Sequence, residues 1–259
     1  MEVQVISITQ SLIKGLENLT AEELLIWNAR VSNPSNAANT GTSVKLLKYL
    51  INNKHWSPLD MVDFTVQVKT SRAIGAQILR HWSFDFQEFS QRYAEAVELE
   101  PVQIRRAGST TRQGSAEEFD PELKIEVNCL EQEGIASELI NLHLEYSVAL
   151  YQALLKAGVA KECARMILPL TTQTTINMKS SVRNWLFYFS QRLDAHAQLE
   201  HRQLAEMIIP IFMGHFPNVW QAFSENDERI NIRAAGRVFD EKGEPTQWPM
   251  NEIKENQGE

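Results

Sequence analysis

The sequence predicts an α+β fold in which a small antiparallel or mixed sheet packs against a helical majority. Two segments, 3–8 and 61–69, alternate apolar and polar residues as half-buried strands do. Most other apolar residues recur at helical spacing, and no internal repeat is present. The length of 259 residues suits one large domain. We therefore expect a single domain over residues 1–225, followed by a polar C-terminal extension at 226–259.

The first half of the chain is expected to contain two strands and three helices. Thr20 and Glu23 form a capping box that begins the first helix. Ser71 is expected to begin the third helix, which carries Arg80 and His81 near its C-terminal end. In order, we expect a strand at 3–8, a helix from 20 toward 30, a loop at 33–42, a helix at 44–51, a turn at 55–58, a strand at 61–69 and a helix from 71.

The second half is expected to be mostly helical. Gly134 is expected to break a helical run that Gly158 ends, and Pro169 is expected to stop the next helix. In order, we expect a polar loop at 105–120, one long helix or two at 121–157, a short helix at 160–168, a β-prone segment at 171–177 and a helix from about 181 that continues or kinks toward 209.

Composition excludes several classes of protein. The chain has 25 Lys and Arg against 33 Asp and Glu, so its net charge of −8 disfavours binding to nucleic acid or to an anionic membrane surface. Cys129 and Cys163 form no CxxC pair, which disfavours a disulfide framework and makes the cytoplasm the expected compartment. The first residues lack the features of a signal peptide, and no apolar run is long enough to span a membrane.

The densest group of polar side chains lies between Gln77 and Tyr93, directly after an apolar helix. Arg80 and Arg92 offer guanidinium groups suited to phosphate, and Glu88 is suited to a ribose or a base edge. The aromatic residues Trp82, Phe84 and Phe86 are suited to packing against a planar ring. On residue types alone, a nucleotide site and a solvated turn with a few core aromatics are equally good interpretations.

This segment resembles the signature of flavin-dependent thymidylate synthases, which reads Arg-His-Arg, seven residues and Ser. Here it stands as Arg80-His81-Trp82, seven residues and Ser90, with Trp82 where the family usually has arginine. Four further segments resemble motifs of the same family in the same order. They are Arg30-Val31-Ser32, His55 to Asp60, Glu162 to Leu170, and Arg183 with Arg192 and His196 to Glu200.

The resemblance implies a reaction, its cofactors and an assembly. Members of this family methylate dUMP reductively at C5 to give dTMP. The carbon comes from methylenetetrahydrofolate and the hydride from reduced FAD, which NADPH re-reduces. The resemblance also implies a homotetramer whose active sites lie at subunit junctions, in the fold of this family. It implies no nucleic-acid or membrane partner.

The resemblance implies a catalytic role for Arg192, whose positive charge at the uracil edge favours ionisation of N3 and polarises the ring. The backbone of the loop from Glu88 to Arg92 is implied to surround the phosphate, and Arg165 to complete the clamp. Ser90 has no His–acid pair in its motif, so a binding role is expected for it. The implied dUMP-binding residues are Gln77, Ile78, Leu79, Arg80, Glu88, Phe89, Ser90, Gln91, Arg92, Arg165 and Arg192.

The resemblance also implies a flavin side, and this is where the sequence departs from the family. Trp82, Ser181 and Phe187 each stand where the family commonly has another residue. We therefore hypothesise that FAD is still bound, with its adenine or diphosphate held differently. The alternative is a nucleotide-binding pseudoenzyme or subunit that has lost flavin chemistry. The implied FAD-binding residues are Ser57, Arg80, His81, Trp82, Glu88, Ser181, Val182, Arg183, Phe187 and His196.

Three further features have simpler interpretations. The histidines show no metal-binding spacing, so no metal site is expected. Glu162 and Arg165 stand three residues apart, so taken without the family they are expected to form a surface ion pair. The basic loop of Arg105, Arg106 and Arg112 is either solvated or a site for the glutamate tail of folate or a dinucleotide phosphate.

Overall fold

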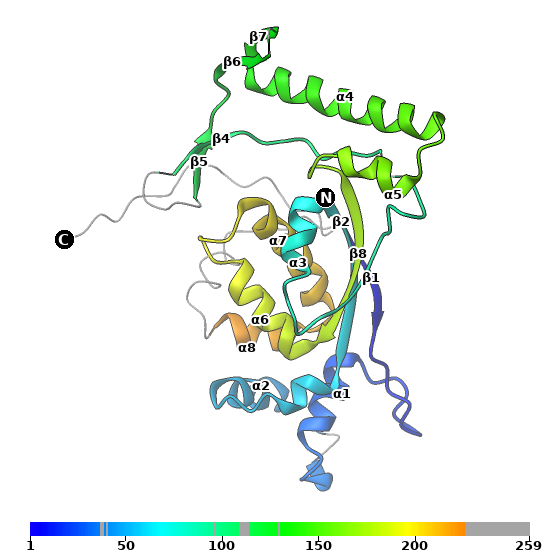
Figure 1. Cartoon of the computed structure of the whole chain (residues 1–259). Coiled ribbons are helices and arrows are strands. Elements are labelled where there is room, and N and C mark those ends of the chain that lie inside the picture. Colours follow the sequence, from blue (N-terminus) through cyan, green and yellow to red (C-terminus); the bar gives the residue numbers. More distant parts are fainter. Residues whose placement is uncertain (37–38, 40, 96, 109–113, 129, 226–259) are drawn as a thin grey trace, which may run out of the picture.

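The structure is a computed structural model, and it describes residues 1–36, 39, 41–95, 97–108, 114–128 and 130–225. Its centre is a four-stranded antiparallel sheet in the order β1-β2-β8-β3 (Figure 1). The strands are β1 (Glu2–Ile8), β2 (Asp63–Ser71), β3 (Asp85–Glu88) and β8 (Gln173–Ser181). The strands expected from 3–8, 61–69 and 171–177 are therefore confirmed, whereas β3 was not expected.

Helices make up most of the remaining domain. The capping box at Thr20 and Glu23 is confirmed, and so is the helix that it begins. The helices beside the sheet and below it are α1 (Ala21–Ala29), α2 (Ser43–Asn52), α3 (Arg72–Ile78), α6 (Val182–Arg192), α7 (Leu199–His215) and α8 (Pro217–Ser224). Short helical turns are η1 (Pro34–Asn36), η2 (Ser57–Met61), α5 (Lys161–Ala164) and η3 (Arg165–Ile167).

Two strand–helix units determine where the functional side chains lie. Ser71 ends β2 and caps α3 with its side chain, and Ser181 ends β8 and stands at the N-cap position of α6. The two strands are antiparallel, with Ser71 opposite Gln173 and Asp63 opposite Ser181, so the two helices start at opposite ends of the sheet. They then run back toward each other. The C-terminal ends of α3 and α6 meet as a result, and the residues that follow α3 face those that end α6.

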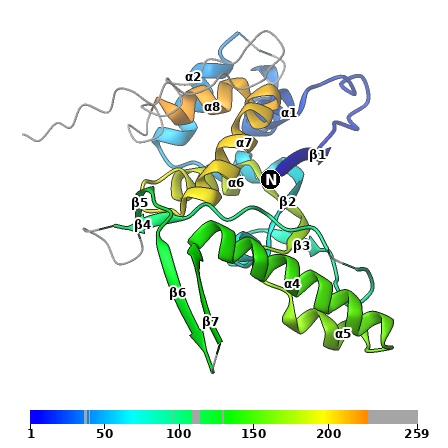
Figure 2. The same cartoon turned by 90° about the horizontal axis from the view of Figure 1, so that it is seen from above.

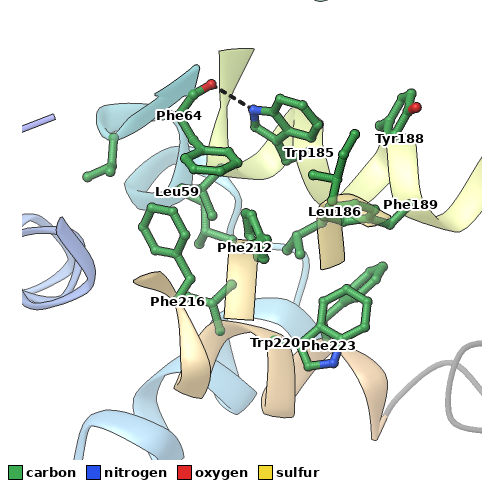
Figure 3. Packing of buried hydrophobic residues seen from close by; sticks show 14 of the residues in the cluster. Leu59, Phe64, Trp185, Leu186, Tyr188, Phe189, Phe212, Phe216, Trp220 and Phe223 are labelled. Atoms are coloured by element: carbon green, nitrogen blue, oxygen red, sulfur yellow. Dashed lines mark hydrogen bonds between the residues drawn. The ribbon is translucent and has the colours of Figure 1, made fainter. Parts of the chain in front are cut away.

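The hydrophobic core lies between this sheet and helices α6, α7 and α8 (Figure 3). Phe64 of β2 packs edge to face against Trp185 of α6 and Phe212 of α7, with ring centroids 5.4 and 5.8 Å apart. The Trp185 indole N–H donates a 2.8 Å hydrogen bond to the Phe64 carbonyl, so even the polar atom of this buried ring has a partner. This packing holds α6 firmly against the sheet.

Residues 105–135 differ from the expectation. The expected polar loop contains a hairpin of β4 (Arg105–Ala107) and β5 (Ser115–Glu118). The helix expected from residue 121 is wrong before Ala136: β6 (Glu122–Val127) and β7 (Leu130–Ile135) form a second hairpin, and α4 (Ala136–Lys156) follows (Figure 2). Residues 122–127 alternate strictly between charged and apolar side chains, as a strand does. Lys124 pairs across the hairpin with glutamates of β7, and this cross-strand pairing favours strands over a helix there. Gly134 lies within β7 and breaks no helix.

Three boundaries also differ. The helix α3 ends at Ile78, so Arg80 and His81 follow it and are not part of it. The helix expected from 181 to 209 is two helices, α6 and α7, separated by residues 193–198. Gly158 adopts a φ of +87° and ends the run of α4, as expected. The expected extension at 226–259 lies outside the described residues. No described helix is long and apolar enough to cross a membrane.

Candidate active site

The meeting point of α3 and α6 is a contact between Arg192 and His81. Arg192 is the last residue of α6, and its Nε–H donates a 2.8 Å hydrogen bond to His81 Nε2. His81 is therefore a neutral acceptor whose proton lies on Nδ1. Its ring is buried and stands edge-on to Tyr188, with centroids 5.0 Å apart. This contact holds the guanidinium of Arg192 in one orientation, and its Nη groups take part in no hydrogen bond among the described residues.

Burial and positive charge keep His81 and His201 neutral at neutral pH. Burial, with the nearby Arg192 cation, lowers the pKa of His81 to about 4. His201 of α7 is fully buried, and the same causes, with His81 as a third, lower its pKa to about 3. Burial lowers the pKa of Arg192 itself, and the Arg80 cation lowers it further while Tyr188 opposes this. A fixed positive charge thus stands among neutral rings.

These pKa values predict a loss of stability in mild acid. A histidine whose pKa is lower in the folded state than in the unfolded chain is neutral in both states well above its unfolded value of 6.5. Below that value the unfolded chain takes up a proton that the folded state refuses, so the folded state becomes less stable as pH drops. We expect the free energy of unfolding to fall by roughly 3 kcal/mol in total between pH 7 and pH 5. Denaturant unfolding at several pH values measures this. A His201→Gln variant should show a shallower dependence, and an equally steep one would contradict the assignment.

A cavity of about 460 Å³ opens beside Arg192 at the turn between α6 and α7. His196 at its wall is exposed and pairs with Asp194, with Nδ1 and Oδ1 2.7 Å apart. The lining residues are Ser190, Gln191, Arg192, Asp194, His196 and Ala197. Two predicted site residues, Arg192 and His196, therefore share one open hollow.

A second group of predicted residues gathers where α5 faces the segment after β3. Arg92 pairs with Glu162 at 3.4 Å, so the pairing of Glu162 with Arg165 expected from spacing alone is replaced. The buried Nε of Arg165 has no hydrogen-bond partner among the described residues. Ser90 Oγ accepts from the N–H of Arg92 at 3.4 Å, and the N–H of Phe89 donates to the Thr175 carbonyl at 2.8 Å. Two N–H groups of the predicted phosphate-binding loop thus already have partners.

Polar contacts within the described part of one chain do not connect these two groups of predicted residues. Among the described residues, no hydrogen bond or ion pair joins the group of Gln77, Arg80, His81 and Arg192 to the group of Ser90, Arg92 and Arg165. Glu88, at the end of β3, accepts from Thr174 Oγ1 at 2.8 Å and lies 3.6 Å from Arg72. The predicted dUMP residues therefore form two groups that no described polar contact connects.

Four of the ten predicted flavin residues, Ser57, Ser181, Arg183 and Phe187, lie around the first half of α6. Asp60 accepts hydrogen bonds from Ser181 Oγ and from Arg183, both at 2.9 Å. The ring of Phe187, one turn further along, lies 5.2 Å from that of Trp56, and the Arg183 guanidinium lies 5.7 Å from it. Ser57 begins η2 beside them. Two rings, a cation and hydroxyl groups thus form one partly exposed surface.

Some predicted residues lie elsewhere. Ile78 and Val182 are fully buried in the core, so their side chains are not available to a ligand. Phe84 is also in the core and does not present a ring to a cofactor. Trp82 is 93% exposed and stands away from the packed aromatic residues. Of two other predicted dUMP-binding residues, Leu79 has an exposed side chain and Gln91 a buried one.

His201 is the residue of this site to which sequence reasoning assigned no role. Its Nδ1 lies 3.2 Å from Gln77 Oε1, and its ring lies 6.1 Å from that of His81. In the sequence it stands next to Glu200 of the recognised motif, within an amphipathic helix, which was the available signal. The described residues contain no group of three or more His, Cys, Asp or Glu side chains that could hold a metal ion.

Comparisons with known proteins identify the family to which this chain belongs. Residues 15–218 match the family model described as thymidylate synthase complementing protein. A probable flavin-dependent thymidylate synthase of Paramecium bursaria Chlorella virus 1 is 43% identical over 86% of this chain and 98% of its own length. A flavin-dependent thymidylate synthase of Synechocystis sp. is 44% identical over 85% of this chain and 97% of its own length.

A solved structure shares the fold. The crystal structure of a UMP/dUMP methylase from Streptomyces cacaoi, bound with 5-Br dUMP, superposes with a TM-score of 0.69. It covers 86% of this chain and 94% of the methylase chain, at 21% sequence identity. The family model spans most of the chain. Two relatives above 40% identity align with it over nearly their whole length. The chain therefore belongs to the family of flavin-dependent thymidylate synthases.

Proposed function

We propose that this protein converts dUMP to dTMP, with the uracil ring held against Arg192. The observation that carries this proposal is the Arg192–His81 contact beside the cavity, since it holds a guanidinium in one orientation. Methylation at C5 needs an electron-rich uracil. A fixed cation at N3 and O4 stabilises the negative charge that develops there, so this residue raises the nucleophilicity of C5.

The remaining residues of this half-site bind and orient the nucleotide. Arg80 follows α3 and adds a second positive charge close enough to lower the pKa of Arg192. Gln77 offers a carboxamide that can read a polar edge of the base or sugar. No residue in this group is paired as an activated nucleophile, so binding and electrostatic stabilisation are the roles that this half-site supports.

The surface at the start of α6 fits a flavin dinucleotide. Its partly exposed rings suit a planar ring system, and the buried Nε of Arg183 has no hydrogen-bond partner among the described residues. Ser57, Trp56, Ser181, Arg183 and Phe187 would hold the cofactor there. When bound, FAD supplies the redox chemistry, with the carbon from methylenetetrahydrofolate and reducing equivalents from NADPH.

The aromatic residue on this surface should contribute to flavin affinity. Phe187 is 40% exposed, and it packs on Trp56 without being needed in the core. We expect Phe187→Ala to weaken FAD binding by roughly tenfold, because a stacked ring contributes on the order of 1 kcal/mol. Titration of flavin fluorescence measures this. Tyr146→Ala, which removes an exposed ring from α4, is the control. Equal FAD affinity in both variants would show that Phe187 is not part of the flavin site. If the wild type takes up no FAD at micromolar protein, the flavin assignment itself is wrong.

A homotetramer is the assembly that completes the site. The two half-sites are separate within one chain, and Arg165 carries a buried Nε that the described residues leave without a partner. A second copy of the chain can bring its Arg92 and Arg165 to the nucleotide that Arg80 and Arg192 hold in the first. The phosphate would then meet cations from two subunits.

One incubation tests the proposed function. Purified protein is incubated without oxygen with FAD, NADPH, methylenetetrahydrofolate and dUMP, and dTMP is measured by mass spectrometry. Formation of dTMP that depends on FAD supports the synthase. Bound dUMP without any dTMP would favour the non-catalytic nucleotide binder, and the changed flavin side at Trp82, Ser181 and Phe187 would be the site of the lost function.

A further inference from the structure

A chain of hydrogen bonds runs from the β4–β5 hairpin to Gln77. Arg105 of β4 donates to one carboxylate oxygen of Glu200, at the start of α7, and both side chains are largely buried. Gln198 Nε2 donates to the other oxygen of Glu200 at 2.9 Å. Gln77 Nε2 donates to Gln198 Oε1 at 2.5 Å, and Gln77 Oε1 lies 3.2 Å from His201 Nδ1. In Figures 1 and 2 the hairpin lies beside the start of α7, as these contacts require.

The direction of every bond in this chain follows from its charged end. An arginine only donates and an ionised carboxylate only accepts, so Glu200 must receive an N–H from Gln198. Gln198 then has only its oxygen for Gln77, and Gln77 must turn its nitrogen toward Gln198. The Gln77 oxygen is left facing His201, whose Nδ1 must carry the proton. One charged pair thereby determines the orientation of two carboxamides and the tautomer of a buried histidine.

The electrostatics of Glu200 agree with this direction. Burial raises the pKa of Glu200, but hydrogen bonds from Arg105, its own backbone and Gln198 outweigh burial and leave the pKa below its ordinary value. Glu200 is therefore an acceptor at neutral pH. Arg105 is also occupied by Ser115 and Gln103, at 2.9 and 3.2 Å. Arg105 therefore has a structural role at this point, and its guanidinium is not a solvated cation available to folate or to a phosphate.

We propose that Arg105, Glu200 and Gln198 are positioning residues that hold the Gln77 carboxamide with an N–H, and not its oxygen, toward the nucleotide. Among the hydrogen bonds that the described residues make, the second N–H of Gln77 takes no part, so it remains for a substrate oxygen. The inference rests on the proposed function, because it needs dUMP at this half-site. Without this series of hydrogen bonds, the Gln77 carboxamide is able to rotate by half a turn. Its oxygen would then face a substrate oxygen, and no hydrogen bond could form between them.

The test replaces Gln198 with methionine, which keeps the length of the side chain and removes both hydrogen bonds. The side chain is exposed, so the fold should tolerate the change. We expect the KM for dUMP and its dissociation constant to rise roughly tenfold, with kcat changed less than threefold and the melting temperature unchanged. Glu200→Ala should raise the KM as well.

A second trio of residues supplies a matched control. Gln221 Nε2 donates to Glu225 Oε1 at 2.9 Å, and Lys48 pairs with Glu225 at 2.5 Å. This trio repeats the amide–carboxylate–cation arrangement on α8 and α2, and none of its residues is placed in either half-site. Gln221→Met and Glu225→Ala should leave the KM for dUMP unchanged.

The outcomes separate this inference from the proposed function. A wild-type protein that binds no dUMP would overturn both. A wild type that makes dTMP, with a Gln198→Met variant of unchanged KM, would overturn only the positioning role. A Gln198→Met variant with a lowered melting temperature and an unchanged KM would show that these hydrogen bonds only stabilise the start of α7, and it would overturn the positioning role.

Discussion

Replacing Arg192 with alanine is expected to lower the rate of dTMP formation by at least 100-fold. The guanidinium supplies the positive charge at the uracil edge, and loss of one such electrostatic partner commonly costs 10² to 10³ in rate. FAD affinity should change little, because the aromatic surface at Trp56 and Phe187 lies beside the first half and the middle of α6, whereas Arg192 is its last residue. Steady-state kinetics with dUMP as the varied substrate, together with a flavin titration, measure both quantities.

A lysine at the same position separates charge from geometry. Arg192→Lys keeps a cation but removes the Nε–H that donates to His81. We expect its rate to lie between those of the alanine variant and the wild type. If Arg192→Ala loses dTMP formation and FAD binding to the same extent, the residue has a structural role and the catalytic assignment is wrong.

The largest effect on stability is expected at Trp185. This side chain is fully buried among Phe64, Phe84 and Phe189, and its indole N–H donates to the Phe64 carbonyl. Trp185→Ala removes that packing and leaves a cavity and an unpaired carbonyl, which should lower the free energy of unfolding by roughly 3–5 kcal/mol. Denaturant unfolding followed by circular dichroism measures the change.

Trp82 provides the matched control, because alanine there removes the same side chain from a position that is 93% exposed. Trp82→Ala should leave the free energy of unfolding within about 0.5 kcal/mol of the wild type. Similar losses in the two variants would contradict the assignment of Trp185 to the core. Because Trp185 holds α6 to the sheet, its variant should also lose dUMP and FAD binding as the protein unfolds.

Local signals were sufficient for the elements with a strong period or a clear cap. The alternation in β2, and the Thr20–Glu23 capping box, depend on residues close together in the chain, so they were predictable. The β6–β7 hairpin was missed because a six-residue alternation with charged outer positions is also compatible with a helix. What decides there is the pairing with the opposite strand, which places Lys124 opposite Glu133.

The candidate site divides in the same way. The signature from Arg80 to Ser90 and the segment from Glu162 to Leu170 are contiguous, so the resemblance could be recognised from the residues alone. Two contacts could not be read from sequence spacing. The bond from Arg192 to His81 joins residues 111 positions apart, and that from His201 to Gln77 joins residues 124 positions apart. The first depends on α3 and α6 running toward each other from opposite ends of the sheet, and the second depends on the packing of α7 against α3.

The sequence by itself determined the family, the residue types of the site and most of the regular elements, because motifs, caps and periodicity are local properties of the chain. Tertiary structure alone decided which residues meet. It divided the predicted dUMP residues into two groups, buried Ile78 and Val182 in the core, and paired Arg105 with Glu200. These outcomes follow from antiparallel strand pairing and from the burial of apolar faces, which act between residues far apart in the chain.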